Sequence, residues 1–155
     1  MTTSEHRPPD DNWRQLLVDD AAGLRALLER VRRIAVLGIK TAETRQPAFY
    51  VPEYAQRAGY EIIPVPVYYP AVTEILGETV YRAVADVPGD VDLVNVFRRS
   101  ESIPPHVDDI LAKRPVAVWF QQGIRNDAAA ERLARAGIQV VQDRCLLVEL
   151  RRIGR

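Results

Sequence analysis

The chain has 155 residues, the size of one ordinary domain and enough to bury a hydrophobic core. Apolar residues make up 47% of it, and 21 basic residues balance 21 acidic ones, so no overall field attracts nucleic acid or an anionic membrane. The single cysteine, Cys145, excludes a disulfide within the chain, and no metal-ligand spacing is present. Any binding of anions must therefore be local.

The first twelve residues are polar, and the rest of the chain reads as one unit. We predict a loosely attached tail over residues 1–12 and a single domain over residues 13–155. The tail lacks the apolar segment of a signal peptide, and no apolar run reaches the 18 residues of a membrane span. A cytoplasmic location is the expectation.

Apolar runs and helical patterns alternate along the domain. The expected strands cover Ile34 to Gly38, Tyr60 to Val67, Val91 to Phe97, Val116 to Phe120 and Ile138 to Gln142, and Val80 to Val84 is either a short strand or an extended piece. The expected helices cover Asp19 to Arg33, Pro47 to Ala58, Pro104 to Lys113 with Ser102 as cap, and Ala128 to Ala136 capped by Asn126 or Asp127. The last segment, Arg144 to Arg155, reads as a polar-flanked tail with an apolar centre.

This alternation predicts an α/β, Rossmann-like single domain, with a mostly parallel sheet of about five strands and helices on both faces. Pro64 and Pro66 place the second long strand at an edge of the sheet or end it early. In such a sheet, ligands bind beyond the carboxyl ends of the strands, where the winding reverses. That rule selects four loops: Gly38 to Pro47, Pro66 to Pro70, Phe97 to Ser102, and Gln121 to Asn126.

The loop from Gly38 to Pro47 has the features of a phosphate site. It carries Lys40, Thr41, Thr44 and Arg45, and it leads into a helix N-terminus that offers free N–H groups. Lys40 and Glu43 occupy the later positions of a G-x-G-x-x-G fingerprint, which argues against a standard NAD site, and a Walker P-loop is absent. A merely solvated loop is the alternative.

The other loops each allow two interpretations. Arg98 and Arg99 could hold a phosphate, or could be surface residues paired with Glu101 or Asp108. The segment from Pro66 to Pro70 could form a wall for an adenine ring, or only pack on the core. Gln122 could contact a polar edge of a ligand, while Gly123 permits a tight turn.

Catalytic chemistry has little support in the residues. Cys145 has an arginine neighbour but no histidine close by, so it reads as a small apolar filler. His106 reads as an exposed residue at the start of a helix. We find no defensible pair of nucleophile and base, so we predict no catalytic residue and no metal ligand.

Several motifs in a fixed order resemble a known family. They are Ile34-Ala35-Val36-Leu37-Gly38, then Arg45 with Pro47 and Tyr50, Gly59 to Val65, Leu76-Gly77-Glu78, Asp86-Val87-Pro88, Val91 to Arg98, Val118 to Ile124, and Val140 to Cys145. Together they resemble the stand-alone CoA-binding proteins, whose fold is shared with the N-terminal domain of the succinyl-CoA synthetase α subunit. The resemblance covers about Ile34 to Glu149. Pro66 and Val67 depart from it, because Asn-Pro is usual there.

The resemblance implies coenzyme A as the ligand. It implies phosphates at the first loop with Arg45 as a contact, adenosine near Pro66 to Tyr68, and pantetheine near Phe97 to Ser100 and Gln121 to Gly123. The predicted cofactor-binding residues are Gly38, Ile39, Lys40, Thr41, Thr44, Arg45, Gln46, Pro47, Pro66, Val67, Tyr68, Phe97, Arg98, Arg99, Gln121, Gln122 and Gly123.

The expected function is therefore non-catalytic binding of CoA or an acyl-CoA, with an acyl-CoA enzyme as a possible protein partner. Two alternatives stay open at this stage. One is an NAD(P)-binding enzyme or redox sensor. The other is an interaction module whose cofactor cleft has degenerated.

Overall fold

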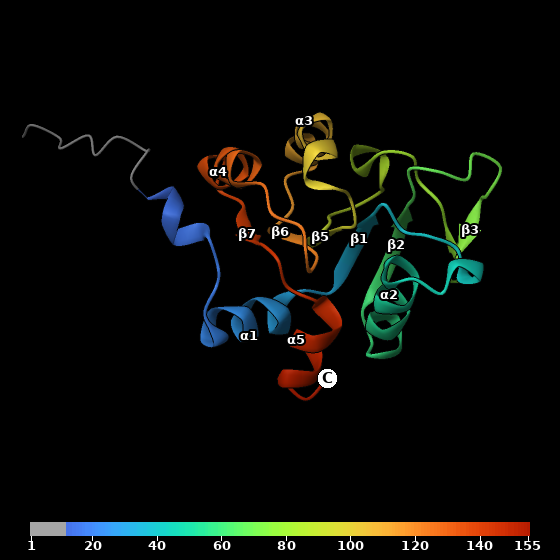
Figure 1. Cartoon of the computed structure of the whole chain (residues 1–155), viewed down its shortest axis with the longest axis horizontal. Coiled ribbons are helices and arrows are strands. Elements are labelled where there is room, and N and C mark those ends of the chain that lie inside the picture. Colours follow the sequence, from blue (N-terminus) through green and yellow to red (C-terminus); the bar gives the residue numbers. More distant parts are fainter. Residues whose placement is uncertain (1–11) are drawn as a thin grey trace, which may run out of the picture.

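The structure is a computed structural model, and it describes residues 12–155. Its centre is a parallel sheet of five strands in the order β2-β1-β5-β6-β7, as Figure 1 shows. The strands are β1 (Arg33–Leu37), β2 (Glu61–Val65), β5 (Leu93–Val96), β6 (Ala117–Phe120) and β7 (Gln139–Val141). This confirms the predicted α/β Rossmann-like fold, including the edge position of β2, where the missing N–H of Pro64 leaves no ladder hydrogen bond unmade.

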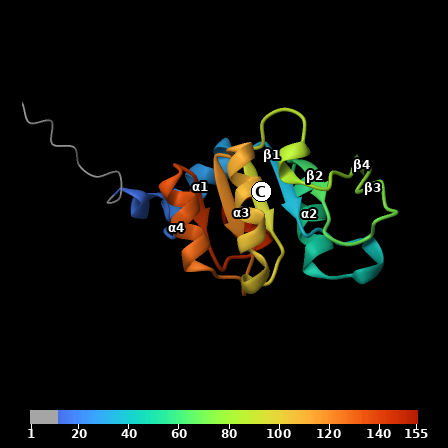
Figure 2. The same cartoon turned by 90° about the horizontal axis from the view of Figure 1, so that it is seen from above.

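Helices cover both faces of the sheet. They are α1 (Ala21–Arg30), α2 (Pro47–Arg57), α3 (Pro104–Lys113), α4 (Asp127–Arg135) and α5 (Leu146–Arg152). In Figure 1, α3 and α4 lie above the sheet, whereas α1, α2 and α5 lie below it. The view from above in Figure 2 shows α3 and α4 side by side across the same face.

Two hydrophobic clusters, one on each face, hold the layers together. Alternate residues of β6 enter different clusters: Val118 and Phe120 face α3 and α4, whereas Ala117 and Trp119 face α1 and α5. A strand buried on both faces needs apolar residues at every position, which is why these strands read as continuous apolar runs.

The winding of the sheet reverses beside β1. The chain passes from β1 outward to β2 and then returns to β5 on the other side of β1. The amide of Gly38 donates to the carbonyl of Val65, and the amide of Phe97 donates to the carbonyl of Leu37. The loops after β1 and β5 therefore diverge from adjacent points, which is the place where a doubly wound sheet binds ligands.

Several local predictions were wrong. Of the two alternatives for Val80 to Val84, the strand is absent from the described residues; a small hairpin of β3 (Glu74–Ile75) and β4 (Glu78–Thr79) precedes this segment instead. Ser102 does not cap α3, because a 3₁₀ turn over Ser100–Ser102 makes Ile103 the cap residue. The predicted terminal tail contains α5, whose Leu146 and Leu150 are fully buried.

Other local predictions were confirmed or lie beyond what the structure describes. Asn126 caps α4, since its side-chain oxygen accepts from the amide of Ala129. The first helix is shorter than predicted and ends at Arg30, because β1 already begins at Arg33. The predicted tail falls, except for its last residue, outside the described residues, and the division into tail and domain stays a prediction. No helix of residues 12–155 is long and apolar enough to span a bilayer, and the cytoplasmic location stays a prediction.

Candidate functional site

An open cleft of about 510 Å³ lies at the carboxyl ends of β1, β5 and β6. Three loops and the start of α2 form its walls. The lining residues are Lys40, Gln46, Pro47, Ala48, Phe97, Arg98, Arg99, Ser100, Glu101, Gln121, Gln122, Gly123 and Ile124. Three cationic side chains and one acidic side chain face this space, so a chain with no net charge has a locally positive cleft.

The first wall is the loop between β1 and α2. Thr44 folds it back, since its hydroxyl donates to the carbonyl of Thr41 and accepts from the amide of Gln46. The ammonium of Lys40 donates to the side-chain oxygen of Gln46, which holds both residues at the cleft. Arg45 has a left-handed backbone conformation, with φ of +53°, and its exposed side chain lies outside the lining.

The N-terminus of α2 supplies a backbone donor. Pro47 has no N–H, and the amides of Phe49 and Tyr50 both donate to the carbonyl of Gln46. Among the described residues, the amide of Ala48 has no backbone partner, and Ala48 lines the cleft. A free N–H at the positive end of a helix dipole suits an anionic group.

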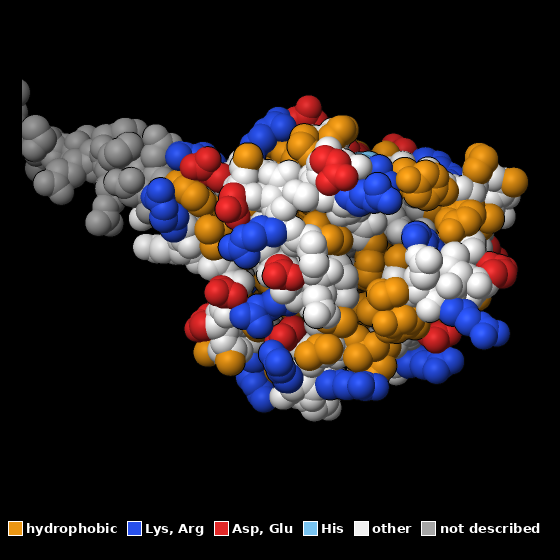
Figure 3. Space-filling model, in the orientation of Figure 1, with side chains coloured by type: hydrophobic (Ala, Val, Ile, Leu, Met, Phe, Trp, Pro, Cys, Tyr) orange, Lys and Arg blue, Asp and Glu red, His pale blue; other side chains and the backbone are white. Residues whose placement is uncertain are grey.

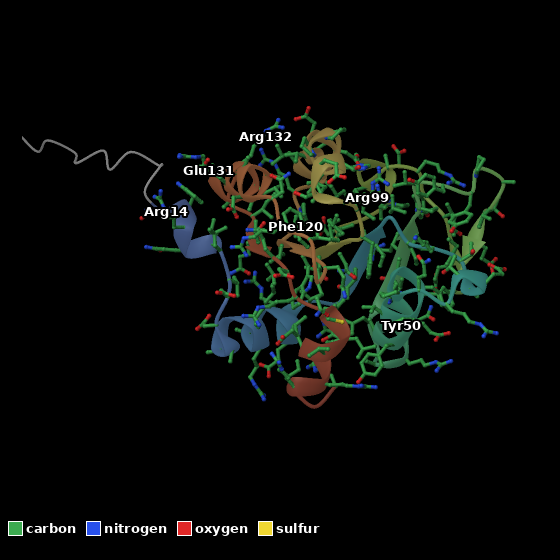
Figure 4. The ribbon with its side chains drawn as sticks, in the orientation of Figure 1. Arg14, Tyr50, Arg99, Phe120, Glu131 and Arg132 are labelled. Carbon is green, nitrogen blue, oxygen red and sulfur yellow. The ribbon has the colours of Figure 1, made fainter. Side chains whose placement is uncertain are left out.

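The second wall is the loop after β5, and it carries the two arginines. Arg98 is half-buried, and its Nε is buried without a hydrogen-bond partner among the described residues. Its guanidinium lies 5.9 Å from the ring centre of Tyr68 and, through a hydrogen bond and its charge, lowers the pKa of the Tyr68 hydroxyl. Figure 4 shows Arg99 beside the tip of β1, at this same end of the sheet.

The alternative reading of Arg98 and Arg99 as partners of Glu101 or Asp108 is wrong for the structure described. Asp108 pairs with Arg132 instead, and neither Arg98 nor Arg99 forms an ion pair within residues 12–155. A buried donor without a partner costs about 1–3 kcal/mol unless something satisfies it. The arrangement is therefore suited to an anionic ligand.

The third wall follows β6 and contains an amide that is almost fully buried. Gln121 is only 4% exposed yet lines the cleft, and its side-chain oxygen accepts from Asn95 and from the amide of Leu146. Gln122 and Gly123 are exposed, and the amide of Gly123 donates to the carboxylate of Asp143. That bond fixes the turn beside the cleft.

The predicted cofactor-binding residues divide into two groups. Nine line the cleft: Lys40, Gln46, Pro47, Phe97, Arg98, Arg99, Gln121, Gln122 and Gly123. The other eight do not: Gly38, Ile39, Thr41, Thr44, Arg45, Pro66, Val67 and Tyr68. Ile39 and Pro66 are buried, whereas Tyr68 is 60% exposed and reaches the site through Arg98.

Four lining residues are missing from the predicted cofactor-binding set, although Ser100 ends the range expected near pantetheine: Ala48, Ser100, Glu101 and Ile124. Ser100, Glu101 and Ile124 lie in loops that the sheet rule had already selected, so that rule was the signal that could have found them. Ala48 has no such signal, because an alanine in the first turn of a helix carries no chemistry of its own.

His106 and Cys145 lie apart from the cleft lining. His106 is half-buried rather than exposed, and burial, with a smaller contribution from the charge of Arg98, lowers its pKa. Cys145 is half-buried in a separate pocket with Arg144, Arg152 and Gln122. Over residues 12–155, no cluster of three or more histidine, cysteine or carboxylate side chains could hold a metal ion.

The fold and cleft define a class of protein: a small Rossmann-like domain with a cationic site at the switch point of its sheet. Comparison with known proteins makes the class specific. The family model described as a CoA binding domain matches residues 32–151, most of the chain. The chain belongs to this family of CoA binding domains, and the resemblance read from its motifs is confirmed.

Relatives of similar size support the assignment. The Bacillus subtilis (strain 168) protein YneT, described as uncharacterized, is 37% identical over 127 residues, covering 82% of this chain and 91% of YneT. A solved Thermus thermophilus structure, described as cell-free ID.343, is 39% identical with a TM-score of 0.80, covering 87% of this chain and 99% of that one. A hypothetical protein from Pyrococcus horikoshii OT3 is 29% identical with a TM-score of 0.79, covering 87% of this chain and 92% of that one.

A larger enzyme contains the same fold. The dinucleotide-forming acetyl-coenzyme A synthetase 1 of Ca. Korarchaeum cryptofilum is similar over 70% of this chain and 25% of its own, with 21% identity and a TM-score of 0.58. At this identity the likeness shows the fold alone.

Proposed function

We propose that the protein binds coenzyme A, or an acyl-CoA, in the cleft at the carboxyl ends of β1, β5 and β6, without catalysing a reaction itself. The observation that carries the proposal is the donor set of the cleft in a member of the CoA binding domain family. Lys40, Arg98 and Arg99 provide cations, and Ala48 provides a backbone N–H. Coenzyme A carries a pyrophosphate and a 3′-phosphate, which are the groups that such donors bind.

The apolar and amide parts of the cleft fit the rest of the molecule. Phe97 and Ile124 offer apolar surface for the pantetheine chain, and Gln121 and Gln122 offer amide groups to its peptide-like bonds. Tyr68, exposed and held beside Arg98, is an aromatic face against which adenine can stack. In this proposal the residues of this cleft bind coenzyme A, and the binding requires no metal ion.

The proposal includes the absence of catalysis because of the residues that line the cleft. Its lining holds no histidine or cysteine, and its one acidic residue, Glu101, is exposed. A nucleophile and a base within hydrogen-bond reach of each other, which group transfer requires, are absent among the lining residues. The protein then acts as a carrier or sensor of CoA, or as a partner of an acyl-CoA enzyme.

Isothermal titration calorimetry tests the proposal directly. The full chain is titrated with CoA, dephospho-CoA and NAD. We expect CoA to bind most tightly, dephospho-CoA more weakly because the 3′-phosphate is missing, and NAD not to bind. No heat with CoA at high micromolar concentrations would refute the proposal, and tighter binding of NAD would support the redox alternative. Native mass spectrometry of freshly purified protein gives an independent reading, since CoA and NAD differ in mass.

A further inference from the structure

We propose that Asn95 is a positioning residue that sets the direction of the Gln121 amide, so that this amide offers its NH₂ group to a carbonyl of the pantetheine arm. The inference rests on the proposed function and assigns a role to a residue outside the cleft lining. Asn95 lies in the middle of β5, between Val36 of β1 and Trp119 of β6, and none of it is exposed.

Two hydrogen-bond donors meet at one oxygen. The side-chain oxygen of Gln121 accepts from Nδ2 of Asn95 at 3.3 Å and from the backbone amide of Leu146 at 3.3 Å. The amide of Leu146 belongs to the first residue of α5 and can only donate. If the Gln121 side chain turned over, its NH₂ group would face this donor. The Leu146 amide and the Asn95 side chain both donate to this oxygen, so together they fix the orientation of the Gln121 amide, and loss of Asn95 leaves only one of the two bonds that hold it.

The consequence appears on the cleft side. With its oxygen bound twice, Gln121 has only its Nε2 left, and this nitrogen has no hydrogen-bond partner among the described residues. Gln121 lines the cleft while remaining nine-tenths buried. A donor of fixed direction at the cleft surface favours a ligand acceptor and disfavours a ligand donor. Amide carbonyls of a pantetheine chain are acceptors of this kind.

The burial of Asn95 carries a free-energy cost, and this cost fits a positioning role. Its Oδ1 is buried without a partner among the described residues. Turning the Asn95 amide over would bring this oxygen against the oxygen of Gln121, so the unpaired state is the consequence of donating to Gln121. A leucine at this position would have similar volume and no unpaired oxygen, so the core would tolerate it better than it would tolerate most changes to a buried polar residue.

The test compares two ligands in Asn95→Leu. Coenzyme A contains the pantetheine arm, and 3′-phosphoadenosine 5′-diphosphate is the same nucleotide without it. Calorimetry should show CoA affinity reduced about fivefold, the loss of one oriented hydrogen bond, with nucleotide affinity changed by less than about twofold. An equal loss of affinity for both ligands would overturn the inference, because the substitution would then disturb the whole fold. No loss of CoA affinity would also overturn it, because Asn95 would then have no effect on the pantetheine arm.

Gln139→Leu is the matched control. Gln139 also carries a buried side-chain oxygen without a partner among residues 12–155, but it stands at the amino end of β7, the opposite end of the sheet from the cleft. Its substitution should leave the affinity for both ligands unchanged. A loss of CoA affinity as large as that of Asn95→Leu would show that removing any buried amide is sufficient, and would overturn the inference.

Nuclear magnetic resonance of the free protein separates this inference from the proposed function. The two side-chain NH₂ protons of Gln121 should give distinct, slowly exchanging signals in the wild type and faster-exchanging signals in Asn95→Leu. Unchanged signals would overturn the positioning role even if CoA binds. If the wild type bound neither CoA nor the nucleotide, the proposed function would fail and the ligand part of this inference with it, while the spectra would still decide whether Asn95 orients Gln121.

Discussion

Gly38, the first residue after β1, lies directly against the backbone carbonyl of Phe97, the first residue after β5. A β-carbon built on Gly38 would overlap this oxygen, and the φ of Gly38 is +86°. The loops that form two walls of the cleft thus separate at a contact between two backbones. Only glycine satisfies both the space and the conformation.

Substitution of this glycine should therefore cost stability. We expect Gly38→Ala to lower the free energy of unfolding by about 3 kcal/mol, because the positive φ and the overlap with backbone both have to be accommodated. Gly137→Ala is the control, since Gly137 has a φ of +90° but nothing within 4 Å of the added carbon. It should lose only about 1 kcal/mol. Urea unfolding measures both, and equal losses would contradict the role of the Phe97 contact.

Arg98, which lines the cleft, and Arg45, which lies outside the lining, should differ in their effect on CoA affinity. We expect Arg98→Gln to weaken binding about tenfold, the effect of losing a charged hydrogen bond, because its partner-free Nε lies at the site. The family resemblance makes Arg45 a phosphate contact, yet its side chain is exposed and outside the lining. Calorimetry on Arg45→Glu decides between the two readings, and unchanged affinity would remove Arg45 from the site.

The packing of α5 should contribute strongly to stability. Leu146→Ala removes a fully buried side chain and should lower the free energy of unfolding by about 2–5 kcal/mol. Val148, on the same helix, is 39% exposed, so Val148→Ala should change stability by less than about 0.5 kcal/mol. Figure 3 shows hydrophobic surface over α2 and α5, the region to which exposed Tyr50 and Val148 belong. Similar losses in the two variants would contradict the buried position of α5.

His106 should make stability depend on pH in the mildly acidic range. Burial, and then the charge of Arg98, lowers its pKa in the folded state below the ordinary value of about 6.5. The folded protein then binds a proton less readily than the unfolded chain, so the contribution is full above about pH 6.5 and is lost as the pH falls toward the lowered value. His106→Gln should reduce the drop in unfolding free energy between about pH 7 and pH 5. An unchanged drop would assign it to other groups.

The fold could be predicted from sequence because the strands are buried on both faces. Runs such as Val116 to Phe120 admit few other structures once they alternate with helical patterns, and the parallel order follows from short right-handed connections. The four ligand loops followed from the same topology. By contrast, α5 was not predicted. Its residues are buried by packing on the face of the sheet that α1 and α2 also cover, and the sequence of the segment does not reveal this packing.

The sequence by itself determined the class of fold, the loops that surround the cleft, and the family to which the chain belongs. Tertiary structure decided which side chains of those loops face one another. Thr44 and the left-handed Arg45 turn the first loop so that Lys40, not Arg45, faces the cleft. Asn95 meets Gln121 only because β5 and β6 are neighbours in the sheet, although the two residues are 26 positions apart in sequence. Contacts across the sheet depend on the register of its strands, and no local pattern carries that information.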